Sequence, residues 1–270
     1  VHNGQVDPSF FEEVPKEKLH TTCDTEALLH IYRQYGEYNF VQEIPGAYTL
    51  AIADKRKRDV MVLRDRSGMK PAALGWKDGK YGVASEDIAF RKNGGEYVED
   101  IDPGSIYYLS PEGEFTKVSL MEPELSHCFF QWNYIADVDS ILNGVSVRRV
   151  REALGEEVAE EFHPDDADLV TYLPRCPEVA ARAYAKKTQL PFRPVFYKMR
   201  AERSFQGTTA KDRQRSIGGN LHLLPGMGEA LRGKTVVLLD DSIVRGNNSK
   251  RARDLLYEEA NVETAYLVSY

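Results

Sequence analysis

The stretch VVLLDDSIVRGNNS, residues 236–249, places four apolar residues directly before two aspartates and a polar loop. The apolar run is typical of a buried strand, and the loop leads into a helical pattern, NSKRARDLLYEEA. Ligands of open α/β sheets bind beyond the carboxyl ends of the strands, where a helix N-terminus offers unpaired N–H groups to an anion. The stretch therefore predicts an anion site at the end of a parallel strand.

Each part of this stretch has a chemical reason to contribute to such a site. Asp240 and Asp241 follow the strand, where carboxylates can accept sugar hydroxyls or hold Mg²⁺. The loop after them is expected to wrap a phosphate, and Gly246 would allow close backbone approach. Its residues are Ser242, Ile243, Val244, Arg245, Gly246, Asn247, Asn248 and Ser249. On spacing alone, an ordinary strand-to-helix connection with Asp241 capping a turn explains the pattern equally well.

Strand and helix patterns alternate on both sides of this motif. Helical patterns occur at 147–161 and 177–189, and strand patterns at 167–174, 194–199 and 262–270. Alternation at this spacing predicts βαβ units and a parallel sheet.

The first half of the chain follows a different pattern, with short β-like runs separated by turn signals such as KDGK and NGGE. One helical pattern interrupts it at 23–36, with Asp24 or Thr25 as the expected N-cap and Gly36 as the stop. Leu28, Leu29, Ile31 and Tyr32 are expected on one apolar side of this helix. We therefore expect two domains, 1–125 and 126–270.

Composition limits the classes of protein that fit. The chain has 270 residues, 42% of them hydrophobic, and a net charge of −7, which argues against a nucleic-acid binder held by overall basicity. No apolar run is long enough to span a membrane and no secretory signal is visible, so we expect a cytoplasmic protein without a membrane partner. The opening VHNG without Met and the strand-like end indicate a fragment.

Residues 236–249 closely resemble the phosphoribosyl-pyrophosphate (PRPP) loop of type I phosphoribosyltransferases, in the form found in the amidophosphoribosyltransferase family, the glutamine PRPP amidotransferases. The segment HCFFQWNYIADVDSILNGVSVRRVREALGEEVA, 127–159, is similar to another motif of that family. In the first half, VHNG, CDTEALLH, GAYTLAI, RDRSGMKP and ASED resemble, in order, motifs of its glutaminase domain. The resemblance implies an α/β plus β-rich α+β fold. An incomplete glutaminase domain of the Ntn-hydrolase type, 1–125, would precede a truncated phosphoribosyltransferase domain, 126–270, with a parallel sheet.

The resemblance also implies an activity. Family members hydrolyse glutamine and transfer the ammonia to PRPP, giving 5-phosphoribosylamine, glutamate and pyrophosphate, the first step of de novo purine biosynthesis. By resemblance, Asn3 and Gly4 form the oxyanion hole and Asp24 holds the α-amino group of glutamine. Asp240 and Asp241 would contact the ribose hydroxyls and Mg²⁺, and residues 242–249 the 5′-phosphate. Plainer explanations are an Asn-Gly turn and a helix cap at Asp24.

A basic stretch, KMRAERSFQGTTAKDRQRS at 198–216, resembles the flexible flap that closes over pyrophosphate. Its cationic residues are Lys198, Arg200, Arg203, Lys211, Arg213 and Arg215, and we expect Arg203 to bind substrate. A solvated charged loop is the alternative.

Four departures from the family pattern leave a second function open. First, the family's N-terminal cysteine nucleophile would lie before Val1. Second, IGGN at 217–220 replaces a basic run of the family, and third, Arg175 to Pro177 replaces small hydroxyl residues. Fourth, Asn247 and Asn248 replace two threonines of the family's loop. The alternative is a catalytically impaired paralogue that binds PRPP or a nucleotide and regulates a partner. Another glutaminase-coupled synthase is disfavoured, because those enzymes lack a DDSIVRG loop.

The cysteines bear on cofactors. Cys23, Cys128 and Cys176 form no CxxC pair, which excludes a disulfide framework or zinc ribbon within the chain. Cys128 matches an iron–sulfur ligand position of some relatives, but one cysteine does not make a cluster site, and we expect packing instead. The expected ligands are therefore Mg²⁺, PRPP and glutamine or ammonia, with a homo-oligomer implied only by the resemblance.

Overall fold

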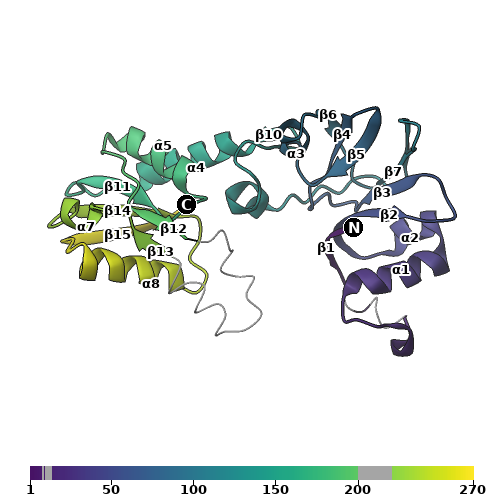
Figure 1. The fold of residues 1–270 in the computed structure, drawn as a ribbon, viewed down its shortest axis with the longest axis horizontal. Coiled ribbons are helices and arrows are strands. Elements are labelled where there is room, and N and C mark those ends of the chain that lie inside the picture. Colours follow the sequence, from purple (N-terminus) through teal and green to yellow (C-terminus); the bar gives the residue numbers. More distant parts are fainter. Residues whose placement is uncertain (8, 10–13, 200–220) are drawn as a thin grey trace. The chain divides into compact units, whose positions relative to one another are not determined.

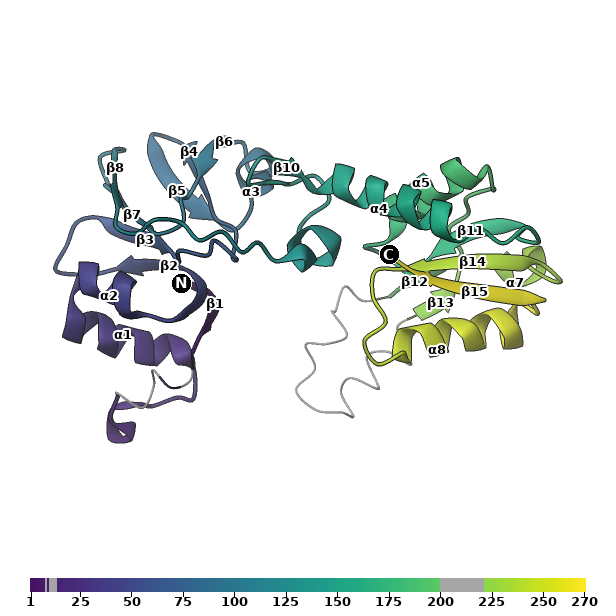
Figure 2. The same ribbon diagram turned by 180° about the vertical axis from the view of Figure 1, so that it is seen from behind.

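The computed structural model describes residues 1–7, 9, 14–199 and 221–270, which form two compact units. The first unit comprises Val1–Gln131 and Asp139–Ser146, and the second comprises Trp132–Val138 and Val147–Tyr270 (Figures 1 and 2). The division falls after Gln131, beyond the expected boundary near residue 125, and residues 139–146 return to the first unit. The functional identity of the two units stays a prediction.

Two antiparallel sheets build the first unit. The five-stranded sheet has the order β1 (His2–Val6), β2 (Gly46–Ala53), β3 (Val60–Arg64), β7 (Ser105–Leu109), β8 (Phe115–Ser119). The three-stranded sheet has the order β5 (Lys80–Ala84), β4 (Ala73–Lys77), β6 (Glu96–Asp100). The remaining elements are η2 (Lys16–Lys18), α1 (Asp24–Tyr35), α2 (Glu37–Glu43), α3 (Ile88–Lys92) and the hairpin of β9 (Ile141–Leu142) and β10 (Val145–Ser146).

Strand β3 is buried on both faces. Met61 and Leu63 pack in the apolar cluster that contains Leu28 of α1, whereas Val62 packs in the cluster that contains Leu74 of β4. Because successive side chains of a strand point to opposite faces, α1 covers one face of the five-stranded sheet and the three-stranded sheet covers the other. Figure 1 shows this layering around β2 and β3.

Helix α1 begins at Asp24, so neither Asp24 nor Thr25 is its N-cap and that expectation is wrong. Cys23 is the N-cap residue, and Asp24 is the first helical residue. Leu29 is 50% exposed and does not share the buried face of Leu28, which is a second correction. Gly36 ends the helix as expected, with a positive φ of 75°, but α2 starts directly after it and has no counterpart among the helices expected from sequence.

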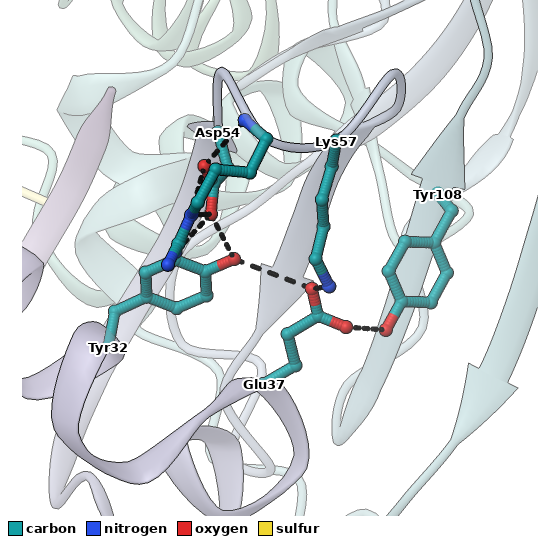
Figure 3. Close-up of polar contacts among 6 residues, drawn as sticks. Tyr32, Glu37, Asp54, Lys57 and Tyr108 are labelled. Carbon is teal, nitrogen blue, oxygen red and sulfur yellow. Dashed lines mark hydrogen bonds and ion pairs between the residues drawn. The ribbon is translucent and has the colours of Figure 1, made fainter.

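A polar network holds the corner between α1 and α2 (Figure 3). The Tyr32 hydroxyl lies 3.3 Å from Asp54 Oδ2 and 3.4 Å from Glu37 Oε1, and the Tyr108 hydroxyl donates to Glu37 Oε2 over 3.0 Å. Lys57 forms an ion pair with Glu37. These contacts join α1 and α2 to the β2–β3 turn and to β7.

The second unit contains the parallel sheet predicted from the alternating pattern. Its order is β11 (Leu169–Tyr172), β14 (Thr235–Asp240), β15 (Thr264–Ser269), with both pairings parallel. The other elements are η3 (Gln131–Ile135), which begins in the first unit, α4 (Val147–Glu161), α5 (Glu178–Thr188), β12 (Phe196–Lys198), β13 (Leu221–Leu223), α7 (Met227–Ala230), α8 (Asn247–Asp254) and η4 (Leu255–Glu259).

Helices cover both faces of this sheet, with α4 and α5 on one side and α8 on the other (Figure 2). Val237 and Leu239 of β14 pack with Tyr184 of α5, whereas Val236 and Leu238 pack in the cluster that includes α8 and η4. Burial on both faces explains the continuous apolar run before the two aspartates. In the ranges that the structure describes, no helix is both long enough and apolar enough to cross a membrane.

Gly155 sets the close approach of α4 to α5, because a Cβ built there would lie 2.1 Å from the Ala180 carbonyl oxygen. We expect Gly155→Ala to lower the free energy of unfolding by about 2 kcal/mol, since the helices must separate. Alanine's better helix propensity offsets only about 1 kcal/mol of the strain. Urea unfolding measures the change, with Glu152→Ala, an exposed site on the same helix, as control. A Gly155→Ala protein as stable as that control contradicts the prediction.

Candidate active site

In the first unit, Asn3 and Gly4 lie within β1, paired with Thr49 and Tyr48 of β2. Their explanation as a turn is therefore wrong. Gly4 has φ 145°, and a Cβ built there would lie 2.2 Å from the Ala47 carbonyl oxygen, so this position requires glycine. The Asn3 side-chain amide donates to Ser85 Oγ over 3.2 Å. The β1 backbone and Ser85 thus fix where the Asn3 amide lies.

Asp24 stands at the start of α1, and the fold brings it to His2 of β1. Asp24 Oδ1 lies 3.6 Å from His2 Nδ1, and Thr25 Oγ1 lies 3.4 Å from the same oxygen. His2 and Asn3 are consecutive in the strand, so their side chains leave opposite faces of the sheet. His2 and Ser85 were missed as site residues, although His2 stands beside the Asn-Gly pair and Ser85 lies within the ASED motif.

In the second unit, the two aspartates lie at the carboxyl end of β14, as predicted from the sequence. Asp240 is the last strand residue and is 7% exposed, and its Oδ1 accepts a hydrogen bond from the Asp241 amide over 3.0 Å. Asp241 Oδ1 accepts one from Ser242 Oγ at 3.0 Å, and Asn133 Nδ2 donates to the Asp241 carbonyl at 3.2 Å. The strand tip is thus held from the loop and from η3.

The electrostatics of this pair are dominated by burial. Burial and, second, the neighbouring Asp241 charge raise the pKa of Asp240 to about 7, against the hydrogen bond from the Asp241 amide and the charge of Lys198. Burial also raises the pKa of Asp241, against the Ser242 hydrogen bond and the charges of Lys198 and Arg151. The pKa of Lys198 is lowered by burial, against the attraction of both aspartates. One buried and one half-buried carboxyl group near a single half-buried ammonium favour a ligand that brings positive charge or hydroxyl donors.

The carboxyl pair suits a magnesium ion held jointly with a substrate. Mg²⁺ is usually bound through one or two carboxylates together with substrate phosphate oxygens. Asp240 and Asp241 supply such carboxylates, and their raised pKa values show that the site gains from added positive charge. Within the ranges listed for the fold, no three His, Cys, Asp or Glu side chains gather to hold a metal ion by themselves.

Residues 242–249 run from the strand tip into α8. Ile243 and Val244 are exposed, and Gly246, with φ 66°, precedes the first residue of the helix. The first N–H groups of a helix are not used by its own hydrogen-bond ladder, so the start of α8 at Asn247 offers N–H donors to the loop. The left-handed conformation of Gly246 is one that glycine adopts readily. The phosphate role of this loop stays a prediction.

The other expected site residues are in the basic stretch after β12 and at the cysteines. Arg203 and the IGGN run at 217–220 lie outside the described residues. Cys176 follows β11 and its Sγ lies 3.2 Å from the Tyr134 carbonyl oxygen, and the Pro174–Arg175 peptide is cis. Cys128 is half-buried and forms no disulfide, and an iron–sulfur role for it is untested.

Arg151 was not expected from the sequence to matter near this site. It is almost fully buried in α4, and it donates to the carbonyl oxygens of Trp132 and Ala136, each over 2.9 Å. Those carbonyls flank Asn133, which in turn contacts Asp241. The sequence signal was its spacing: Arg151 lies four residues from both Val147 and Gly155, on one stripe of the helical pattern.

Comparisons with known proteins agree with the motifs. A model of the glutamine amidotransferase domain matches residues 11–118. The amidophosphoribosyltransferase of Methanothermobacter thermautotrophicus is 33% identical, with 99% of this chain and 58% of the relative covered. That of Bacillus subtilis is 31% identical, covering 92% and 53%, and that of Escherichia coli is 30% identical, covering 100% and 59%. The chain thus spans somewhat more than half the length of these relatives.

A solved structure resembles the chain as a whole. Glutamine PRPP amidotransferase from Bacillus subtilis, complexed with ADP and GMP, superposes with a TM-score of 0.84 at 28% identity. The match covers 99% of this chain and 60% of that one. A second structure, of an allosteric regulatory enzyme of purine biosynthesis, gives 0.84 at 29% identity and covers 98% and 58%.

Proposed function

This chain is a homologue of the amidophosphoribosyltransferases along nearly its whole length, and we propose that it works in the same reaction. Glutamine, PRPP and water would give 5-phosphoribosylamine, glutamate and pyrophosphate. The first unit would be the Ntn-type glutaminase domain and the second the phosphoribosyltransferase domain. Because the chain covers only part of its relatives, both the activity and the substrates are parts of this proposal.

The observation that carries the proposal is the end of β14. The buried Asp240 and the half-buried Asp241 stand at the tip of a central parallel strand, and a loop with exposed residues at 243–245 leads from them into α8. This arrangement offers acceptors for ribose hydroxyls at Asp240 and Asp241, and N–H donors for a phosphate a few residues later. One phosphorylated sugar can engage both sets of groups.

The residues of the second unit would act by binding and by electrostatics. Asp240 and Asp241 would orient the ribose hydroxyls, residues 242–249 would hold the 5′-phosphate, and Arg203 would meet the pyrophosphate. Bound Mg²⁺ would neutralise the charge that develops on the leaving pyrophosphate. Lys198, beside the two aspartates, would add a second positive charge on the same side.

The residues of the first unit would act on glutamine. Asn3 would offer its side-chain amide and Gly4 its backbone N–H to the developing oxyanion, and Asp24 would hold the α-amino group. Two observations support this assignment: Ser85 fixes the Asn3 amide, and position 4 has no room for a side chain. The resemblance also supports a homo-oligomer in the cytoplasm, and analytical ultracentrifugation of the chain would test the oligomeric state.

The test separates binding from turnover. Calorimetric titration with PRPP and Mg²⁺ should show binding, and ammonia with PRPP should give phosphoribosylamine without any glutaminase nucleophile. Absence of heat and of a thermal shift at millimolar PRPP would overturn the proposal.

A second candidate is a paralogue that binds PRPP or a nucleotide and regulates a partner. Asn247 and Asn248 favour it, because they keep the backbone donors of the α8 N-terminus but replace two hydroxyls of the family loop. Binding of PRPP without any ammonia-dependent product would select this candidate over the enzyme.

A further inference from the structure

His2 is the residue of β1 that reaches the first turn of α1. Its side chain is 4% exposed, and Nδ1 lies 3.1 Å from Thr25 Oγ1 and 3.6 Å from Asp24 Oδ1. Its Nε2 is buried and has no hydrogen-bond partner in the described part of the chain. The ring is therefore held on one side only, by the residues at the start of the helix.

The contacts of the Asp24 carboxylate all converge on one oxygen. His2 Nδ1, Thr25 Oγ1 and Cys23 Sγ lie 3.6, 3.4 and 3.7 Å from Oδ1. Among the residues that the structure describes, none contacts Oδ2, and the side chain is 27% exposed. The carboxylate thus has one oxygen held from inside and a second one available to a ligand.

We propose that His2 is a positioning residue for an ammonium site at Asp24. Its Nδ1–H donates to Thr25 Oγ1 over 3.1 Å, and the Thr25 hydroxyl in turn donates to Asp24 Oδ1 over 3.4 Å, so that Oδ2 meets the ammonium group of an α-amino acid. The inference rests on the proposed glutamine-binding role of Asp24. It adds that the geometry of this carboxylate is set by β1, the strand that also carries Asn3 and Gly4.

The charge of the imidazole decides how well the site attracts an ammonium ion. Burial lowers the pKa of His2 from its ordinary value of 6.5, against the attraction of Asp24. The charges that act on the ring are Asp24 of α1 and the Val1 amino group, one residue before His2. The Cys23 thiol lies 3.7 Å from Asp24 Oδ1. A neutral ring leaves the Asp24 charge uncompensated, whereas an imidazolium would cancel it. Ligand affinity should therefore fall as the pH drops through the pKa of His2.

Two substitutions separate the role of Nδ1 from that of ring volume. His2→Asn places an amide N–H near the position of Nδ1, and His2→Phe keeps a ring but removes both nitrogens. The probes are L-glutamine and glutaramate, its analogue without the α-amino group. We expect His2→Phe to weaken glutamine binding about tenfold and to leave glutaramate binding unchanged, because only the ammonium contact is disturbed. We expect His2→Asn to bind glutamine like the wild type, without the loss of affinity that the wild type shows below the pKa of His2.

Asp24→Asn is the reference variant that distinguishes the positioning role of His2 from the ammonium-binding role of Asp24. If Asp24→Asn loses glutamine affinity and His2→Phe does not, the His2 inference is wrong and the role of Asp24 stands. If wild type and Asp24→Asn bind both probes alike, the role of Asp24 is wrong and the inference fails with it. The ¹⁵N spectrum of His2 gives a readout that needs no ligand. A proton on Nδ1 supports the inference, and a neutral ring protonated on Nε2 overturns it.

Discussion

Asp240→Asn should remove Mg²⁺-dependent PRPP binding and, at the same time, stabilise the chain at pH 8. The carboxylate that would share the metal and the ribose hydroxyls is lost, so we expect PRPP affinity to fall at least about a hundredfold. The gain in stability follows from burial, which raises the pKa of Asp240 to about 7. Ionising this group in the folded chain is unfavourable, and the neutral amide avoids that cost.

The pH dependence gives the sign of the stability effect. In the unfolded chain an aspartate ionises near pH 4, so between about pH 4 and 7 the folded state holds a proton that the unfolded state has lost. The free energy of unfolding therefore falls as the pH rises across this window and stays lowered above it. We expect Asp240→Asn to raise it by roughly 2–4 kcal/mol at pH 8 and by little at pH 4.

Urea unfolding at the two pH values and calorimetry with PRPP and Mg²⁺ measure these effects. Glu258→Gln, an exposed carboxylate of η4, is the control and should change neither quantity. An Asp240→Asn protein that binds PRPP like the wild type would remove Asp240 from the site. Equal stability changes at pH 4 and pH 8 would contradict the buried-charge explanation.

The elements that could be predicted from the sequence are those with a regular hydrophobic pattern within their own residues. The apolar run of β14 and the helical period of α4 both led to the observed parallel sheet. Helix α2 was missed because seven residues are too short to form a helix on propensity alone. It is stabilised by contacts distant in sequence: Phe40 is fully buried, and Glu37 meets Lys57 and Tyr108, 20 and 71 residues away.

The same distinction applies to the candidate sites. The two aspartates were found because a carboxylate pair at a strand end is a local pattern. Asn133 lies 108 residues from the Asp241 carbonyl to which it donates, and Ser85 lies 82 residues from Asn3. No spacing rule connects such positions, so the residues that fix the site residues became visible only when the chain was folded.

Arg64→Met should cause the largest loss of stability in the first unit. Arg64 is the last residue of β3, and its side chain is almost fully buried. Its guanidinium donates to three backbone carbonyl oxygens: Nε to that of Lys70 over 2.8 Å, Nη1 to that of Ile101 over 2.8 Å and Nη2 to that of Gly68 over 2.7 Å. Burial lowers its pKa, against the charges of nearby aspartates. Methionine fills much of the volume but removes the guanidinium donors from all three carbonyls. The Thr49 hydroxyl, 3.3 Å from the Lys70 oxygen, and the His127 ring, 3.4 Å from the Gly68 oxygen, replace them only in part, so we expect a loss of about 4 kcal/mol.

The geometry of this site also predicts how the conservative variant behaves. Arg64→Lys keeps the charge, but one ammonium cannot reach three carbonyls that a planar fork serves, so it should recover less than half of the loss. Arg66→Met is the matched control, since Arg66 is exposed in the same loop and forms an ion pair with exposed Glu124, and it should cost under about 0.5 kcal/mol. Urea unfolding of the three variants decides the matter. If Arg64→Met unfolds like Arg66→Met, these carbonyls find other donors and the buried guanidinium does not hold the loop that follows β3.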